Sequence, residues 1–194
     1  ADGEVEVTSR TLDDRLWTVA YIMDNGPVRF YLYDRDRKQA DYLFTSNPSL
    51  ESLPLVKMHA EVIRSRDGLN LVSYLSLPAH SDPDVTGRPD APLPMVLLVH
   101  GGPWARDGWG YDPQHQLLAN RGYAVLSVNY RGSTGFGKDF INAANGQWAA
   151  QMHDDLIDAV RWAVQQGIAL EDKIAIMGGS YGGYATLAGV TFTP

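Results

Sequence analysis

The chain contains no cysteine, which excludes disulfide bonds and thiol chemistry. It also has no apolar run of about 18 residues, so no segment is predicted to span a membrane. Clusters of lysine and arginine are missing too, and 23 acidic against 16 basic residues give a net charge of −7. This charge argues against nucleic acid or an anionic membrane as a partner. A disulfide-free chain suits the cytoplasm and the periplasm equally.

The chain also lacks a metal-binding pattern. Its histidines outside the motifs described below are scattered, with no pair four residues apart and no HExxH sequence. These histidines are His59, His80, His115 and His153. We therefore expect neither a metal nor a cofactor.

The most specific motif is a Gly-Gly-Ser-Tyr-Gly-Gly sequence centred on Ser180. In a nucleophile elbow, a serine lies between a strand and a helix, and the residues two before and two after it must be small. Gly178 and Gly182 occupy those positions, the apolar run 173–177 suits a buried strand, and 184–188 can begin a helix. A phosphate-binding loop would need a GK[ST] ending, which is absent. The sequence thus predicts Ser180 as the nucleophile of a serine hydrolase.

A second motif, His-Gly-Gly-Pro-Trp, follows the apolar strand predicted at 95–99. It matches the loop that donates one backbone N–H to an oxyanion hole, the second coming from the residue after the nucleophile. The predicted donors are therefore the N–H groups of Gly102 and Tyr181. His100 precedes the serine, whereas this chemistry takes its base from downstream. We interpret His100 as a structural histidine that bonds to loop backbone.

With Asn-Tyr-Arg-Gly-Ser-Thr-Gly-Phe-Gly at 129–137, these motifs resemble the prolyl oligopeptidase family of serine peptidases over residues 94–194. The acylaminoacyl-peptidase and dipeptidyl-peptidase-like branches are the most similar. The resemblance implies an α/β-hydrolase domain joined to a β-propeller, and cleavage of short peptides by acyl transfer.

The family's catalytic Asp and His follow the serine in the chain. The 14 residues after Ser180 include no Asp, Glu or His. We therefore expect the triad Asp and His to be absent from a chain truncated just after the elbow. Without its base, the chain alone is expected to be inactive.

Residues 1–54 are predicted to form an antiparallel meander. Short alternating runs are separated by polar turns, and the expected strands cover 4–8, 16–22, 28–34 and 42–44. Four such strands are the content of one β-propeller blade. The family resemblance favours a last propeller blade, and a small sheet belonging to the hydrolase is the alternative.

Residues 55–194 are predicted to form the N-terminal part of an α/β-hydrolase domain. Asp67-Gly68 between the runs 60–65 and 69–75 predicts an antiparallel hairpin. After a proline-rich loop at 78–94, strands alternate with helices, which indicates a largely parallel sheet and an α/β fold class. The expected elements are strands at 95–99, 123–128 and 173–177, a short helix near 114–120 and an amphipathic helix around 156–164.

Several charged and aromatic residues receive structural interpretations. Asp154 and Asp155 precede the nucleophile, so we interpret them as caps of the amphipathic helix rather than as the catalytic acid. Arg131 is expected to form an ion pair with that end of the helix, and Gly167 to end it. The residues after the oxyanion loop are candidates for lining a substrate mouth or for packing, namely Trp104, Arg106, Asp107 and Trp109.

Two other functions remain open, a carboxylesterase or lipase fragment and a non-catalytic interaction module. The blade-like first third favours the peptidase, because simple esterases lack it. The expected partners are a short peptide substrate and, through the open edge of the truncated sheet, further copies of the chain.

Overall fold

The computed structural model describes residues 3–194, which form two compact units. The first comprises residues 3–57 and 110–113, and the second 58–109 and 114–194. Residues 1 and 2, which the predicted blade includes, lie outside the described residues. No helix among residues 3–194 is long and apolar enough to cross a bilayer.

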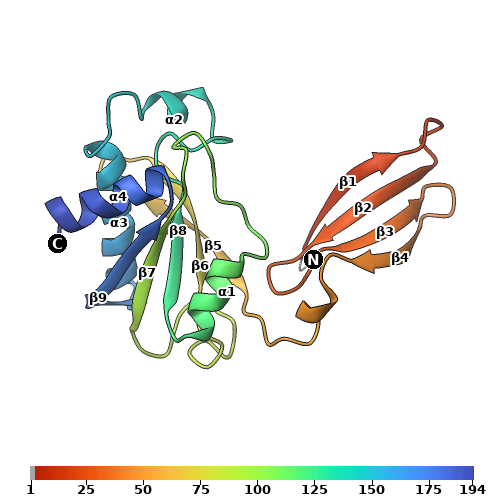
Figure 1. The fold of residues 1–194 in the computed structure, drawn as a ribbon, viewed down its shortest axis with the longest axis horizontal. Helices are drawn as coiled ribbons and strands as arrows, with labels where there is room; N and C mark the ends of the chain where they lie inside the picture. The colour runs from red at the N-terminus through yellow and green to blue at the C-terminus, as the bar shows by residue number, and fades with distance from the viewer. Residues whose placement is uncertain (1–2) are drawn as a thin grey trace. The chain divides into compact units, whose positions relative to one another are not determined.

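The first unit is a four-stranded antiparallel meander (Figure 1). Its strands, in spatial order, are β1 (Glu4–Arg10), β2 (Leu16–Ile22), β3 (Arg29–Asp34) and β4 (Gln39–Thr45). Cross-strand aromatic pairs support the register, as Phe30 stacks on Phe44 with ring centroids 4.8 Å apart and Trp17 lies 6.0 Å from Tyr33. The four predicted strands are confirmed, and β1 and β4 are longer than predicted.

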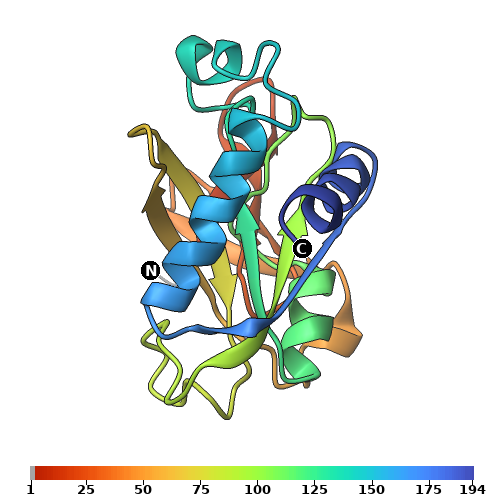
Figure 2. The ribbon, with the colours of Figure 1, turned by 90° about the vertical axis from the view of Figure 1, so that its left-hand side faces the viewer.

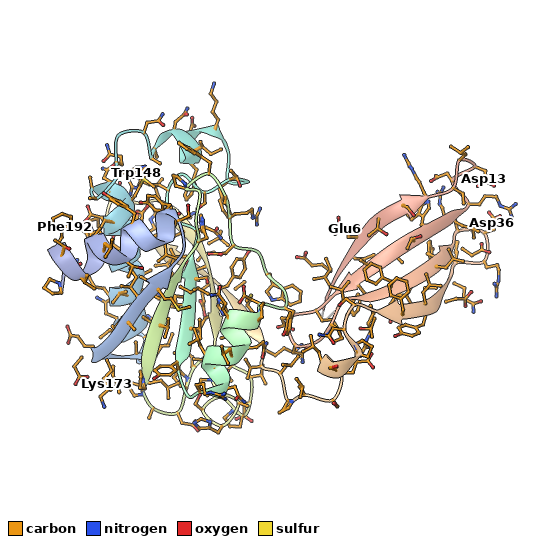
Figure 3. The ribbon with its side chains drawn as sticks, viewed as in Figure 1. Glu6, Asp13, Asp36, Trp148, Lys173 and Phe192 are labelled. Atoms are coloured by element: carbon orange, nitrogen blue, oxygen red, sulfur yellow. The ribbon has the colours of Figure 1, made fainter. Side chains whose placement is uncertain are left out.

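This sheet buries little apolar surface by itself. Among the described aliphatic and aromatic side chains of the unit, only those of Val19, Ala20 and Pro27 are buried. One face carries an apolar hollow of about 470 Å³ lined by side chains that include Val7, Trp17 and Tyr31. Figure 3 shows Glu6, Asp13 and Asp36 along the unit's strands and turns. A single blade is expected to leave its faces exposed in this way, because neighbouring blades normally cover them.

The second unit is built on a five-stranded mixed sheet with the order β5-β6-β8-β7-β9. An antiparallel hairpin of β5 and β6 leads into three mutually parallel strands, as predicted. The strands are β5 (Met58–Arg64), β6 (Asn70–Ser76), β7 (Leu93–Val99), β8 (Ala124–Val128) and β9 (Ala169–Gly178). The predicted α/β fold class is therefore confirmed.

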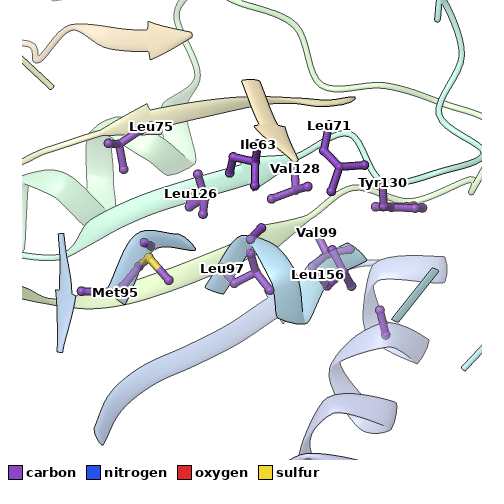
Figure 4. Close-up of a cluster of buried hydrophobic side chains, with 14 of the residues drawn as sticks. Ile63, Leu71, Leu75, Met95, Leu97, Val99, Leu126, Val128, Tyr130 and Leu156 are labelled. Atoms are coloured by element: carbon purple, nitrogen blue, oxygen red, sulfur yellow. The ribbon is translucent and has the colours of Figure 1, made fainter. Parts of the chain in front are cut away.

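Helices cover both faces of this sheet (Figure 2). The covering helices are α1 (Pro113–Asn120), α3 (Gln151–Gln165) and α4 (Tyr181–Phe192). The short helix α2 (Lys138–Asn142) lies beyond the end of the strands (Figure 2), and a 3₁₀ turn η1 (Pro48–Leu50) belongs to the first unit. Leu126 and Val128 of β8 pack in the core with Leu156 of α3 (Figure 4). Ser127 between them bonds to His115 of α1 at 2.8 Å. Because successive strand residues face opposite sides, α1 and α3 cover opposite faces.

Some boundaries differ from the prediction. The strand before the elbow begins at Ala169 rather than Lys173, because its first residues continue directly from the loop and pair with Leu93. Helix α2 was not predicted, since its five residues are too few to show a helical period. Gly167 ends α3 as predicted, with φ of 70° and its N–H 3.0 Å from the Val164 oxygen.

The capping role predicted for Asp154 and Asp155 is wrong. Helix α3 begins at Gln151, its N-cap is Ala150, and no side chain caps it. Asp154 lies in the first turn of the helix, where its charge complements the helix dipole, but neither aspartate caps the helix, and both pair with arginines instead. Asp155 is fully buried against Arg131, and Asp154 accepts a hydrogen bond from Arg66 at 2.7 Å.

Candidate active site

The predicted nucleophile lies where β9 meets α4. Gly178, the last residue of β9, pairs with Val99, the last residue of β7, and α4 begins directly after Ser180. Ser180 has φ of 56° and ψ of −120°, a conformation that non-glycine residues rarely adopt and that is typical of a strained functional turn. Its side chain is exposed at the N-terminal end of the helix, where the helix dipole favours developing negative charge.

Two glycines allow the elbow to pack against the neighbouring strand. A Cβ atom on Gly182 would lie 2.1 Å from the Val99 carbonyl oxygen, and one on Gly178 would lie 2.5 Å from the same atom. Any larger residue at either position would therefore overlap the backbone of β7. By contrast, a Cβ on Gly179 would meet nothing within 4 Å. The structural requirement for small residues thus falls on the two positions that the motif specifies.

The loop after β7 lies directly against this elbow. A Cβ atom on Gly101 would be 3.3 Å from the Ser180 Cβ and 3.2 Å from the Gly179 carbonyl oxygen. The next residue, Gly102, has φ of 120° and leads into Pro103 through a cis peptide bond. The structure therefore brings the two sequence motifs together, although they are separated by about 80 residues in the chain.

The N–H groups of the two predicted oxyanion donors take no part in the backbone hydrogen bonds of residues 3–194. Within residues 3–194, neither the Gly102 nor the Tyr181 amide donates a hydrogen bond to a carbonyl group outside a regular element. Tyr181 is the first residue of α4, so no carbonyl of that helix precedes it to accept its N–H. Two amides with free N–H groups beside an exposed hydroxyl can stabilise the negative oxygen that forms when a hydroxyl attacks a carbonyl.

The His100 side chain is held by contacts with Gly101, Tyr130 and Ser133. Its Nδ1 lies 2.7 Å from the Gly101 carbonyl oxygen and its Nε2 lies 2.9 Å from the Ser133 hydroxyl. The ring stacks on Tyr130 with centroids 4.5 Å apart, and the Tyr130 hydroxyl donates to the His100 carbonyl oxygen at 2.9 Å. Burial lowers the pKa of His100, so the ring is neutral near pH 7. These contacts agree with the structural role expected for His100.

A buried ionic cluster supports the loop that contains Tyr130 and Ser133. Arg131, 3% exposed in its side chain, donates from its backbone N–H, Nε and Nη2 to Asp155, and Nη2 also reaches Asp67 at 2.9 Å. The predicted ion pair of Arg131 is thereby confirmed. Hydrogen bonds from Arg131 and Ser65 lower the pKa of Asp67 to about 2. Burial raises the pKa of Asp155, and the hydrogen bonds from Arg131 oppose that shift.

The residues after the oxyanion loop divide into packing and exposed groups. Trp109 donates from Nε1 to the Met58 carbonyl oxygen at 2.8 Å, which is a packing role. Trp104 is 61% exposed, and the Arg106 guanidinium lies 5.0 Å from the centre of the Phe136 ring. The Asp107 backbone N–H bonds to the Asn129 side chain at 2.9 Å. Exposed Trp104 and Arg106 are thus the members of this group that can meet a substrate.

An aromatic cluster beside the elbow was missed by the sequence interpretation. The Trp148 ring lies 4.9 Å from the Tyr181 ring and 5.0 Å from the Tyr184 ring, and Trp148 is half exposed. Figure 3 shows Trp148 near one end of α3 and α4, while Lys173 lies at the far end of β9. Trp148 belongs to an irregular segment between α2 and α3, so no periodic pattern in the sequence indicated its position.

No histidine among the described residues is hydrogen-bonded to Ser180. No hydrogen bond within residues 3–194 joins the Ser180 hydroxyl to a histidine, and no group of three metal-ligating side chains converges there or elsewhere in those residues. The remaining buried histidines bond to hydroxyl groups, as His115 does with Ser76 at 3.0 Å and His153 with Thr193 at 3.0 Å. The site as described holds a hydroxyl and two amide donors.

Comparisons with known proteins match the whole chain. A sequence model of the prolyl oligopeptidase family matches residues 109–194. Dipeptidyl aminopeptidase BIII of Pseudoxanthomonas mexicana is 62% identical over 99% of this chain, and dipeptidyl peptidase family member 6 of Caenorhabditis elegans is 43% identical over 99%. The chain spans 28% of the length of each of these two relatives.

Solved structures show the same fold. A puromycin-hydrolyzing peptidase of Mycobacterium tuberculosis superposes with a TM-score of 0.78 and 29% identity, covering 92% of this chain and 27% of that one. Pyrococcus horikoshii acylaminoacyl peptidase also superposes with a TM-score of 0.78, at 24% identity, covering 100% of this chain and 30% of that one. The second likeness is one of fold alone.

Proposed function

The chain belongs to the prolyl oligopeptidase family of serine hydrolases, and we propose that it is the part of a longer serine peptidase that carries the nucleophile. The observation that supports this most directly is the approach of the Gly101 loop to Ser180, at 3.3 Å between the Ser180 Cβ and a Cβ built on Gly101. A nucleophile elbow and an oxyanion loop in contact form the working centre of acyl transfer.

In the proposed mechanism, the Ser180 Oγ attacks the carbonyl carbon of the scissile peptide bond while a histidine accepts its proton. The carbonyl oxygen becomes an oxyanion that accepts hydrogen bonds from the Gly102 and Tyr181 amides. The histidine then protonates the leaving amine, and water releases the acyl group from Ser180. We propose that the histidine and its orienting aspartate come from residues beyond Pro194.

The same reasoning gives the domain organisation that we propose. Residues 1–54 form the last blade of a β-propeller, and residues 55–194 form the N-terminal part of the α/β-hydrolase domain. The exposed faces of the four-stranded meander support the first assignment, because a blade packs between neighbours. The blade also favours a peptidase over a carboxylesterase or lipase, which share the elbow but lack such a unit.

Without a base to accept its proton, the Ser180 hydroxyl is not activated as a nucleophile. Members of a catalytic triad act as a unit, and the loss of one costs on the order of 10⁴ to 10⁶ in kcat. We therefore propose that residues 1–194 alone have negligible activity. We also propose that the edge strand β9, which pairs only with β7 among the described residues, takes up a further strand. Sedimentation of the isolated chain tests this, and a stable, cooperatively unfolding monomer would contradict it.

Substrate class is tested on the longer protein. The relative that is 62% identical is named a dipeptidyl aminopeptidase, so dipeptidyl nitroanilides are the first substrates to assay, beside nitrophenyl esters of short fatty acids. We expect hydrolysis of the nitroanilides and its abolition in Ser180→Ala. Rapid ester hydrolysis with no peptide cleavage would instead support the esterase alternative, and retained peptidase activity in Ser180→Ala would exclude Ser180 as the nucleophile.

A further inference from the structure

Arg106 is an exposed arginine whose guanidinium pairs with no carboxylate of the described residues. Its Nε lies 3.4 Å from the Asp107 carbonyl oxygen, a long contact, and its two terminal nitrogens meet no acceptor in the part of the chain that the structure describes. By contrast, Arg66, Arg88 and Arg131 of the same unit each contact a carboxylate at 2.7 Å. Arg106 therefore keeps donors with which it can bind an anion from outside the chain.

The backbone of Arg106 is held on both sides. The carbonyl oxygen of Ala105 accepts a hydrogen bond from the Thr134 N–H at 2.9 Å, and the N–H of Asp107 donates to the Asn129 side chain at 2.9 Å. Both partners belong to the segment that follows β8. Because Arg106 lies between these two attachments, its side chain starts from a fixed position.

The Arg106 side chain is also held along its length. Its guanidinium carbon lies 5.0 Å from the centre of the Phe136 ring, within the range of a cation–π contact. A Cβ atom on Gly135 would lie 2.5 Å from Nη1 and 3.4 Å from Cδ of Arg106, so the arginine occupies the space that a larger residue at 135 would fill. A side chain that is ordered before binding loses less conformational entropy when it meets a ligand.

Arg106 follows closely on the proposed oxyanion donor. A Cβ atom on Gly102 would be 3.0 Å from the Ala105 backbone nitrogen and 3.2 Å from the Ala105 Cβ. The chain therefore turns back at this point and places the residue before Arg106 against Gly102. Since Gly101 of the same loop approaches Ser180, the guanidinium belongs to the rim of the site at which a substrate carbonyl would be attacked.

A peptide substrate has one carboxylate that does not depend on its sequence, at its C-terminus. In acyl transfer the N-terminal part of the peptide becomes the acyl group, and the C-terminal part leaves as an amine. The terminal carboxylate is thus always carried by the leaving part. A planar guanidinium can bind such a carboxylate through two parallel hydrogen bonds.

We propose that Arg106 binds the C-terminal carboxylate of the leaving part, and so selects peptides that extend only one or two residues beyond the scissile bond. The proposal rests on the function proposed above, since it takes Ser180 as the nucleophile and Gly102 as an oxyanion donor. The length limit follows because Arg106 lies four positions after Gly102, on a loop that turns back on itself. A longer leaving part would carry its carboxylate past the guanidinium.

The assay uses the full-length protein and measures the release of Ala-Ala from three peptides. These are Ala-Ala-Phe, its C-terminal amide, and the C-terminal amide of Ala-Ala-Asp, which carries a carboxylate only on its side chain. A dipeptidyl nitroanilide, whose leaving group has no carboxylate, is the reference. An exposed ion pair alone is worth less than about fivefold in affinity, whereas a charge-assisted hydrogen bond is worth about tenfold or more. We expect kcat/KM to be about tenfold higher for Ala-Ala-Phe than for its amide, through a lower KM.

Variants assign this preference to one side chain. Arg106→Gln should lower kcat/KM for Ala-Ala-Phe about tenfold and leave the amide and the nitroanilide nearly unchanged. Arg106→Lys keeps the charge but loses the planar fork, so it should retain part of the preference. Arg121→Gln is the matched control, because Arg121 is also exposed, bonds to Asn120 rather than to a carboxylate, and precedes β8 at the end of the sheet opposite the elbow. It should keep the full preference.

Several results would overturn the proposal. Equal losses on every substrate in Arg106→Gln would show that Arg106 only supports the loop. Equal cleavage of Ala-Ala-Phe and its amide by the wild-type protein, or a preference for the Asp side chain alone, would show that the terminal carboxylate is not the ligand. A preference for the free acid that survives in Arg106→Gln would assign it to another group. An equal preference in peptides with four residues after the scissile bond would refute the length limit.

Failure of the proposed function would look different. It would appear as nitroanilide hydrolysis that persists in Ser180→Ala, or as a wild-type protein that cleaves neither the nitroanilide nor any of the peptides. A wild-type protein that hydrolyses the nitroanilide through Ser180 but treats acid and amide alike would refute only the role of Arg106.

Discussion

An alanine at position 182 has no room for its methyl group. The new Cβ would lie 2.1 Å from the Val99 carbonyl oxygen and 3.0 Å from the Val99 carbonyl carbon, where ordinary contact begins at about 3.4 Å. The obstacle is the backbone at the C-terminal end of β7, a strand paired on both sides, so it cannot rotate away as a side chain can. Overpacking of this kind costs about 1–3 kcal/mol, and a backbone clash belongs at or above the upper end.

A second effect opposes this cost. Gly182 is the second residue of α4, where alanine favours the helix over glycine by at most the helix-interior value of about 0.5–1 kcal/mol. The net expectation for Gly182→Ala is a loss of at least about 2 kcal/mol in the free energy of unfolding. Gly179→Ala is the matched control, because a Cβ there meets nothing within 4 Å. We expect the control to change the free energy by less than about 0.5 kcal/mol.

Urea denaturation of both variants in the full-length protein measures these values, and labelling by a fluorophosphonate reports on the elbow. Gly182→Ala should also slow labelling, because β7 must shift away from the elbow and carry the oxyanion loop with it. If Gly182→Ala unfolds at the same urea concentration as Gly179→Ala, the elbow does not pack against β7 at the distances described.

Three further predictions concern the groups that hold the loop after β8. Asp155→Ala should lower the free energy of unfolding by about 3–5 kcal/mol in urea titrations, because Arg131 stays buried without its carboxylate; a loss under about 1 kcal/mol would contradict this. The pKa of Asp67 is about 2, below its unfolded value, so its contribution is present above about pH 4 and is lost as the pH falls towards 2; Asp67→Asn should weaken this acid dependence of the denaturation midpoint, and an unchanged profile would count against the assignment. Tyr130→Phe removes the hydroxyl that donates to the His100 carbonyl and should cost about 1 kcal/mol, whereas unchanged stability would show that this bond contributes nothing.

Most of the fold could be predicted from the sequence because its signals are local. The parallel strands contain the apolar runs 95–99, 124–126 and 174–177, the hairpin strands mix apolar and polar residues, and the Asp67-Gly68 turn fixed the hairpin. The elbow was equally readable, because the need for glycine at 178 and 182 is set by contacts that any such turn must make. The boundaries were less accurate, since the start of β9 depends on pairing with β7 rather than on its own residues.

The errors concern residues whose role depends on distant partners. Asp154 and Asp155 have the composition of a helix start, and only the position of Gln151 shows that the helix begins before them, so that neither is its cap. Asp155 meets Arg131 across 24 positions, and His100 meets Ser133 across 33, distances over which the sequence carries no local signal. Trp148 was missed for the same reason, because its contacts with Tyr181 and Tyr184 come from the packing of an irregular segment on α4.

Mapping the site of covalent modification tests the central claim most directly. The full-length protein is treated with a fluorophosphonate, digested and examined by mass spectrometry, alongside Ser180→Ala. We predict a single stoichiometric adduct on Ser180, with peptidase activity lost in proportion to labelling, and neither adduct nor activity in the variant. An adduct on another residue with Ser180 unmodified, or a fully active Ser180→Ala protein, would contradict the assignment of Ser180 as the nucleophile.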